Sequence, residues 1–148
     1  MIELRHFEPR EFGLWWPWMD PRLLESLDEF RDRLGAPVMI SPAQGALGRR
    51  LGEAGRSRHN VDRWKRVMAA DVMLPRGPDL TDPEQGRAVV ELARQAGFGG
   101  IGLYPDWKPH PGLHLDIRPL KADGAPATWS RIGGRYLAME AAWEEGVA

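Results

Sequence analysis

Apolar residues recur at helical spacing early in the chain and predict an amphipathic helix over residues 21–34. Asp20 can cap this helix, and Pro21 suits its first position because that position has no hydrogen-bond partner to lose. Gly35 marks its end. The apolar residues that would share the buried face are Leu23, Leu24, Leu27, Phe30 and Leu34.

Two later segments also carry helix signals. A helix is predicted over residues 83–97, with Thr81 or Asp82 as its capping residue and a proline at its first position. A terminal helix is predicted over residues 136–145, after a turn marked by the glycines at 133–134. We expect this last helix to close the hydrophobic core.

Short aliphatic runs between these segments predict strands at residues 37–41, 69–74, 99–104 and 113–117. Residues 42–60 are rich in Gly and Arg and lack sustained periodicity, which predicts a long loop of the kind that is often functional. We expect an α+β fold with a small, mostly antiparallel sheet and helices packed on one face.

Two of the predicted strands carry polar residues on the face opposite their aliphatic residues. Asp71 occupies that face of the strand at 69–74, and His114, Asp116 and Arg118 occupy it on the strand at 113–117. The ordinary explanation is a solvated outer face of an antiparallel sheet. The alternative is a functional site on this face.

Composition narrows the possible classes of function. With 148 residues and no repeat or linker, the chain is expected to form one domain over residues 1–148. The net charge of -1 gives no general reason to expect binding of nucleic acid, and the apolar runs are too short to span a membrane. Residues 1–6 lack the pattern of a secretory signal, so synthesis and retention in the cytoplasm are expected.

The absence of cysteine means that any transition metal must be held by imidazole and carboxylate groups. His59, Asp71 and His114 supply two imidazoles and one carboxylate, which is the ligand count of a catalytic zinc with one position open for water. A plain globular protein in which the two histidines never meet is the alternative, because spacing alone does not bring them together.

Two segments resemble the M15 family of zinc peptidases, which includes D-alanyl-D-alanine carboxypeptidases and phage endolysins. In SRHNVDRWKRVMAADV, Ser57 and His59 match the family's Ser-x-His and Asp71 its Ala-x-Asp; in GFGGIGLYPDWKPHPGLHLDIR, His114 matches its second histidine. The opening LLESLDEFRDRLGAPVMIS also fits, so the resemblance covers residues 21 to 118. It implies the hedgehog/DD-peptidase fold and Zn²⁺ on His59, Asp71 and His114.

The chain departs from the family pattern between the first two metal ligands. His59 and Asp71 are farther apart than the family usually has them, which implies an insertion around Trp64 and Lys65. If no such insertion exists, Asp62 is the alternative carboxylate ligand.

A second departure concerns the general base. Many members place a Glu or Asp three residues before the second histidine, and that position here is Pro111. His110 and Asp106, on the loop before the strand, are the available replacements, and His110 is favoured because histidine titrates nearest neutrality. An ordinary exposed loop histidine is the alternative.

The resemblance also implies an arginine in the loop before the first histidine, where it would stabilise an oxyanion or bind the terminal carboxylate of a peptide. Arg49 or Arg50 would fill this role. Asp116 is expected to hydrogen-bond a metal-bound imidazole, with Arg118 beside it. A surface ion pair between Asp116 and Arg118 is the alternative.

Taken together, the resemblance implies zinc-dependent hydrolysis of a peptide bond in peptidoglycan, either at the end of a stem peptide or at a cross-link. The lack of a separate cell-wall-binding domain fits a phage-encoded or prophage-derived accessory protein. The competing hypothesis is a non-catalytic structural or binding module of phage origin that keeps the fold and the zinc, and Pro111 is its best support.

Overall fold

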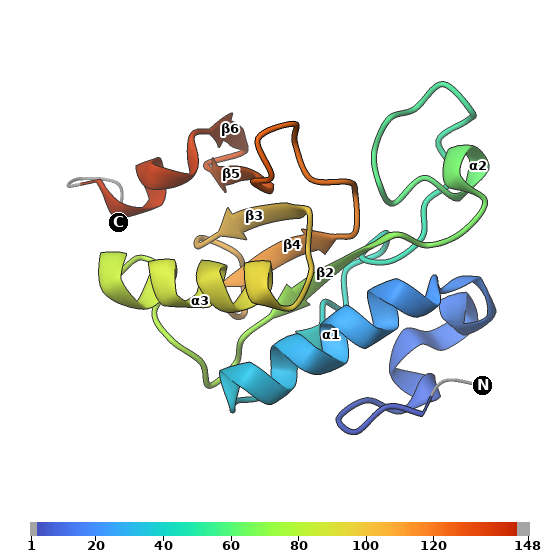
Figure 1. The fold of residues 1–148 in the computed structure, drawn as a ribbon, viewed down its shortest axis with the longest axis horizontal. Coiled ribbons are helices and arrows are strands. Elements are labelled where there is room, and N and C mark those ends of the chain that lie inside the picture. Colours follow the sequence, from blue (N-terminus) through green and yellow to red (C-terminus); the bar gives the residue numbers. More distant parts are fainter. Residues whose placement is uncertain (1–2, 145–148) are drawn as a thin grey trace.

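A six-stranded mixed sheet forms the centre of the protein in a computed structural model that describes residues 3–144 (Figure 1). The strand order is β1-β2-β4-β3-β5-β6, and every neighbouring pair is antiparallel except β3 and β5. The strands are β1 (Met39–Ile40), β2 (Ala69–Met73), β3 (Gly100–Tyr104), β4 (Gly112–Asp116), β5 (Ala127–Ile132) and β6 (Arg135–Leu137). The predicted α+β class is therefore confirmed.

The two long helices begin and end where the capping residues predict. Helix α1 (Pro21–Leu34) begins after Asp20, whose side chain accepts the backbone N–H of Arg22, and ends at Gly35 in the left-handed conformation. Helix α3 (Pro83–Gln95) is capped by Asp82 rather than Thr81. The shorter helical segments are η1 (Pro9–Trp18), α2 (Val61–Trp64) and η2 (Met139–Trp143).

The hydrophobic core lies between these helices and one face of the sheet (Figure 1). Phe30 of α1 meets Phe98 edge to face, with ring centroids 6.3 Å apart. Fully burying each such large apolar side chain stabilises the fold by roughly 1.5–3 kcal/mol. The strand residues on this face are Ala70, Val72, Ile101, Leu103, Leu113 and Leu115.

The opposite face of β2 and β4 is also buried, which excludes the solvated-face explanation. Asp71 and His114 are each 6% exposed, and Asp116 is fully buried. Burying unpaired polar groups is costly, so these side chains need partners inside the protein. The partners define the candidate site described below.

The carboxyl-terminal segment differs from the sequence prediction. The turn at Gly133 and Gly134 is present, but it joins β5 to β6 as a hairpin, and the region predicted as a helix over 136–145 forms β6 and η2. Both glycines have positive φ, 59° and 76°, which suits the tight turns whose twist matches a hairpin. Within residues 3–144, no helix has the length and apolar character needed to cross a bilayer. Met1, Ile2 and Glu145, which entered the sequence predictions, lie outside the described residues.

Candidate metal site

Strand register places two of the predicted metal ligands directly beside each other. Asp71 on β2 is the antiparallel partner of His114 on β4. Side chains of directly opposite residues point to the same face with Cβ atoms about 5 Å apart. Long-range strand pairing therefore joins two residues that are 43 positions apart in the chain.

The third ligand, His59, comes from the long loop and is held in place by backbone hydrogen bonds. The N–H of Arg49 donates to the carbonyl of His59 over 2.8 Å, and the N–H of Val61 donates to the carbonyl of Arg49 over 2.9 Å. The buried Asn60 side chain donates to the carbonyls of Gly52 and Gly55, which closes the loop on itself.

The segment between His59 and Asp71 contains the single helical turn α2. Asn60 caps it by accepting the N–H of Asp62, and Lys65 ends it with a positive φ of 62°. This turn accommodates the 12 positions between His59 and Asp71.

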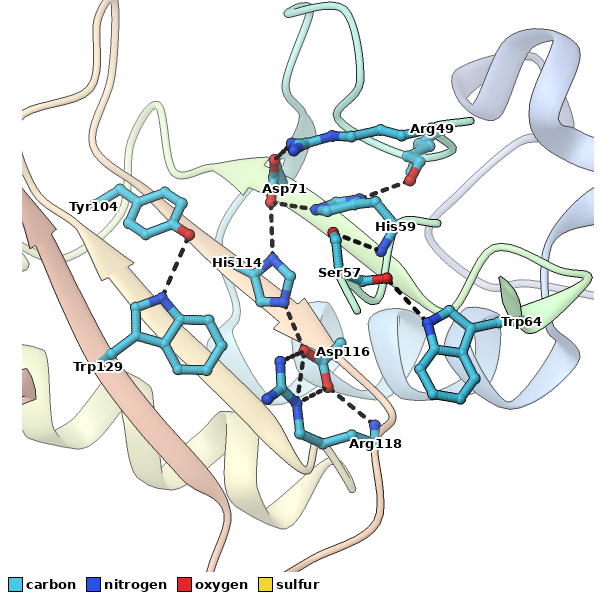
Figure 2. A network of polar contacts seen from close by, with 11 residues as sticks. Arg49, Ser57, His59, Trp64, Asp71, Tyr104, His114, Asp116, Arg118 and Trp129 are labelled. Carbon is cyan, nitrogen blue, oxygen red and sulfur yellow. Dashed lines mark hydrogen bonds and ion pairs between the residues drawn. The ribbon is translucent and has the colours of Figure 1, made fainter. Parts of the chain in front are cut away.

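His59, Asp71 and His114 converge on one point (Figure 2). One ligand atom from each lies within 4.8 Å of the others. Asp71 Oδ1 is 3.1 Å from His59 Nε2 and 3.2 Å from His114 Nδ1. The three predicted ligands are therefore brought together on the buried face of the sheet.

The outward nitrogens of both histidines are held by groups that only accept hydrogen bonds. His59 Nδ1 is 2.6 Å from the carbonyl of Leu47, and His114 Nε2 is 2.6 Å from the carboxylate of Asp116. Each outward nitrogen must therefore carry a proton, which leaves the inward nitrogens of neutral rings as lone pairs facing Asp71. A divalent cation would satisfy all three inward atoms together.

The metal-free protein stabilises this arrangement by holding positive charge at His114. Burial lowers the pKa of His114, but hydrogen bonds to Asp116 and Asp71 outweigh burial and raise it above its usual value. Burial raises the pKa of Asp71, yet hydrogen bonds and charge from His114 and His59 lower it to about 2. The site thus favours cationic charge next to Asp71, which is ionised at neutral pH.

Asp116 and Arg118 form an ion pair next to the outward nitrogen of His114. Arg118 donates to both carboxylate oxygens of Asp116, with Nη2 2.6 Å from Oδ2 and Nε 2.9 Å from Oδ1. Burial raises the pKa of Asp116, but the hydrogen bonds from His114 and Arg118 outweigh it and hold the pKa well below its usual range. Asp116 is buried and contacts His114, and Arg118 is partly exposed, so the two do not form a surface ion pair.

The two candidate arginines lie in different environments. Arg49 borders the site, where its Nη2 is 3.3 Å from Asp71 Oδ2 and its Nε donates to the carbonyl of Gly45. Arg50 instead pairs with Asp62 at 2.9 Å and stacks on Trp18. Asp62 accordingly lies with Arg50 and is not part of the histidine cluster.

Neither candidate base lies in the cleft that contains the metal ligands. Asp106 accepts the N–H of Gly133 over 2.8 Å, which ties the β3–β4 loop to the β5–β6 turn. His110 is partly exposed on the same loop, and neither residue is among those that line the cleft. Trp107 of this loop does line it.

The cleft has a volume of about 330 Å³, and its lining includes side chains that were not predicted from the sequence. Glycines make room for it, because a Cβ at Gly102 would meet the Trp129 indole and a Cβ at Gly112 would meet the Trp107 ring. Besides the metal ligands and Arg49, the lining residues are Ser57, Arg58, Tyr104, Trp107, Arg118, Trp129, Arg131 and Tyr136.

The residues from β5 and β6 were not identified from the sequence. Trp129 packs against the His114 ring with centroids 5.1 Å apart, and its indole N–H points to the Tyr104 hydroxyl at 3.4 Å (Figure 2). The alternation of Trp129 with Arg131 was the available signal, because residues two apart on a strand share a face.

The donor set fits zinc, since two imidazole nitrogens and a carboxylate oxygen with supporting hydrogen bonds are typical of sites that leave a position open. Comparison of the chain with protein-family models, curated proteins and solved structures gives no match.

Proposed function

We propose that the protein is a zinc-dependent hydrolase of peptide bonds, with the metal on His59 Nε2, Asp71 Oδ1 and His114 Nδ1. The observation that carries the proposal is the orientation of the two imidazoles. Each has its outward nitrogen held by an acceptor, Leu47 O or Asp116, and its inward nitrogen aimed at Asp71. When the rings are neutral, this arrangement leaves both inward nitrogens free to bind a metal.

Bound zinc would polarise the scissile carbonyl and lower the pKa of a water molecule at its open position. The chain's own residues would orient the metal ligands and stabilise the charge that develops on the substrate. Asp116 fixes the tautomer of His114, and Arg49 presents a guanidinium beside Asp71 where negative charge would develop on a peptide oxygen. Trp129 and Trp107 give the cleft aromatic walls.

The substrate in this proposal is a peptide of peptidoglycan, either a stem peptide or a cross-link, and the fold is that of the hedgehog/DD-peptidase group. Both rest on the resemblance of residues 21 to 118 to the M15 family. The same resemblance supports an association with a phage or prophage.

One observation favours a second candidate, a module that binds zinc and peptide without cleaving. Apart from the metal ligands, the cleft lining offers no carboxylate or imidazole to act as a base. Burial raises the pKa of Tyr104 to about 12, so its hydroxyl stays protonated at neutral pH. Catalysis then depends on His110 or Asp106 of the adjoining loop.

Zinc content, measured by elemental analysis of the purified protein, tests the metal site. About one zinc per chain is expected in the wild type and none in His114→Ala. His6→Ala is the matched control, because His6 pairs with Asp32 at the surface and should leave the zinc content unchanged. Absence of zinc in the wild type, even after reconstitution, would refute the metallopeptidase proposal.

Cleavage of purified peptidoglycan fragments, followed by mass spectrometry, separates the two candidates. Release of a terminal D-alanine indicates a carboxypeptidase, and separation of cross-linked peptides indicates an endopeptidase. Loss of cleavage in His110→Ala with zinc retained would assign the base. Binding of fragments without cleavage by the zinc-loaded protein would favour the non-catalytic module.

A further inference from the structure

The cleft has an excess of positive charge that the metal site does not account for. Of its four arginines, Arg49 pairs with Asp71 and Arg118 pairs with Asp116. Within residues 3–144, Arg58 and Arg131 have no carboxylate partner. A cleft with unpaired guanidinium groups attracts and orients anionic ligands.

Arg131 stands out from the other three arginines. Its Nε is buried without a hydrogen-bond partner, and among the described residues it is the one such side-chain nitrogen or oxygen. An unsatisfied buried donor costs free energy comparable to the desolvation of the group, so its presence needs an explanation. Because Arg131 also lines the cleft, a ligand that accepts from its Nη groups would offset part of this cost.

The strands around Arg131 shape a place for that ligand. Arg131 is the antiparallel partner of Tyr136, and its guanidinium lies 5.4 Å from the centre of the Tyr136 ring. Tyr104 is on the neighbouring strand at the same level, since Leu103 pairs with Ser130. The Tyr136 ring packs against the guanidinium, and both tyrosines line the cleft with flat rings that a peptide can contact.

The site lies at a defined distance from the metal ligands. β4, which carries His114, and β5, which carries Arg131, are separated by β3 alone. Two strand spacings amount to roughly 10 Å, and Arg131 lies two residues, roughly 7 Å, along β5 from Trp129, which is level with His114 through Gly102. The two backbones are therefore roughly 12 Å apart, which an extended peptide spans with three to four residues. A ligand could therefore occupy both places at once.

We propose that Arg131, with Tyr104 and Tyr136, forms a second anion-binding subsite that holds a carboxylate of the peptide three to four residues from the bond at the metal. This inference rests on the proposed function for the identity of the ligand as a peptide. Guanidinium binds carboxylate through two parallel hydrogen bonds, and the two Nη groups of Arg131, which lines the cleft, can supply both donors. The carboxylate belongs to an acidic side chain or to the end of the peptide.

Calorimetric titration of matched peptides tests the subsite. The probes are acetylated tetra-alanine with a carboxyl-terminal amide, the same peptide with a free terminus, and amidated peptides with one alanine replaced by aspartate at each position. The wild type should bind a charged probe at least about tenfold more tightly than the neutral one. The charged probe that binds most tightly identifies the source of the carboxylate.

In Arg131→Gln, the ratio of the affinities for the charged and the neutral probe should fall to near one. Arg131→Lys should give an intermediate ratio, because lysine keeps the charge but loses the two-pronged geometry. Arg135→Gln is the matched control, since Arg135 is an exposed residue of the same hairpin that does not line the cleft. An unchanged preference in folded Arg131→Gln and Arg131→Lys, or an equal loss in Arg135→Gln, would overturn the subsite.

The titrations are made on zinc-free and zinc-loaded protein, with zinc content recorded for each variant. A preference that depends on Arg131 in a protein that neither holds zinc nor cleaves peptides would refute the proposed function and leave the subsite standing. Zinc binding and cleavage without this preference would refute the subsite alone.

Discussion

Asp116→Asn is expected to weaken zinc binding although Asp116 does not contact the metal position. In the wild type, its carboxylate accepts from His114 Nε2 at 2.6 Å and from Arg118 Nη2 at 2.6 Å and Nε at 2.9 Å. Asparagine has one acceptor oxygen and one NH₂ group. Either His114 or Arg118 would then face a donor instead of an acceptor.

The magnitude follows from which contact is lost. If the asparagine oxygen stays with Arg118, the His114 ring loses the acceptor that fixes its tautomer and orientation. Removing such a supporting carboxylate typically costs about 10–100-fold in metal affinity. This corresponds to about 1.4–2.7 kcal/mol of binding free energy. His59, held by the carbonyl of Leu47, and Asp71 remain in place, so binding weakens but is not abolished.

Competition with a chelator of known affinity measures the effect, at a pH above neutral so that protons compete little for His114. Asp32→Asn is the matched control, because Asp32 Oδ1 also contacts a histidine, His6, at 2.9 Å, but at the surface. An unchanged zinc affinity in folded Asp116→Asn would refute the argument that the outward hydrogen bonds orient the ligands. An equal loss in Asp32→Asn would point to a general effect of charge.

Three further predictions concern stability. Asp71 has its pKa lowered from 3.8 to about 2, so its ionised form should stabilise the zinc-free fold by about 2 kcal/mol above pH 4, a contribution that is lost as the pH falls toward 2. The free energy of unfolding, measured with urea across this pH range, should change less with pH in Asp71→Asn than in the wild type. An identical dependence on pH would contradict the assignment. Gly102→Ala should lower stability by about 1–3 kcal/mol, because the new Cβ meets the Trp129 indole; thermal unfolding equal to wild type would mean that Trp129 is free to move. Leu115→Ala, on the helix-facing side of β4, should cost about 2–5 kcal/mol in urea unfolding without changing zinc content, and loss of zinc in the folded variant would show that the two faces are coupled.

The elements that were predicted well are those determined by nearby residues. The limits of α1 follow from Asp20 and Gly35, because a capping side chain and a left-handed glycine act within one turn of the helix. The faces of β2 and β4 follow from the strict alternation of aliphatic and polar residues. These signals need no knowledge of the rest of the chain.

The carboxyl-terminal hairpin was missed because its signals are ambiguous over a short range. Residues 136–143 contain apolar residues at spacings that also suit a helix, and β6 is stabilised by pairing with β5 rather than by its own sequence. The same error hid Trp129 and Arg131, since a strand that is not recognised gives no indication of which residues face the cleft.

The sequence by itself determined the residue types available for chemistry and the strand faces that carry them. It identified His59, Asp71 and His114 as possible ligands but left Asp62, and the choice between Arg49 and Arg50, open. Only the tertiary structure shows which of these residues lie together, because β2 pairs with β4 and the loop folds so that His59 reaches Asp71, with Arg49 beside it. Capping and alternation depend on contacts within a few residues, whereas register, burial and loop placement depend on contacts between distant segments, which local sequence does not specify.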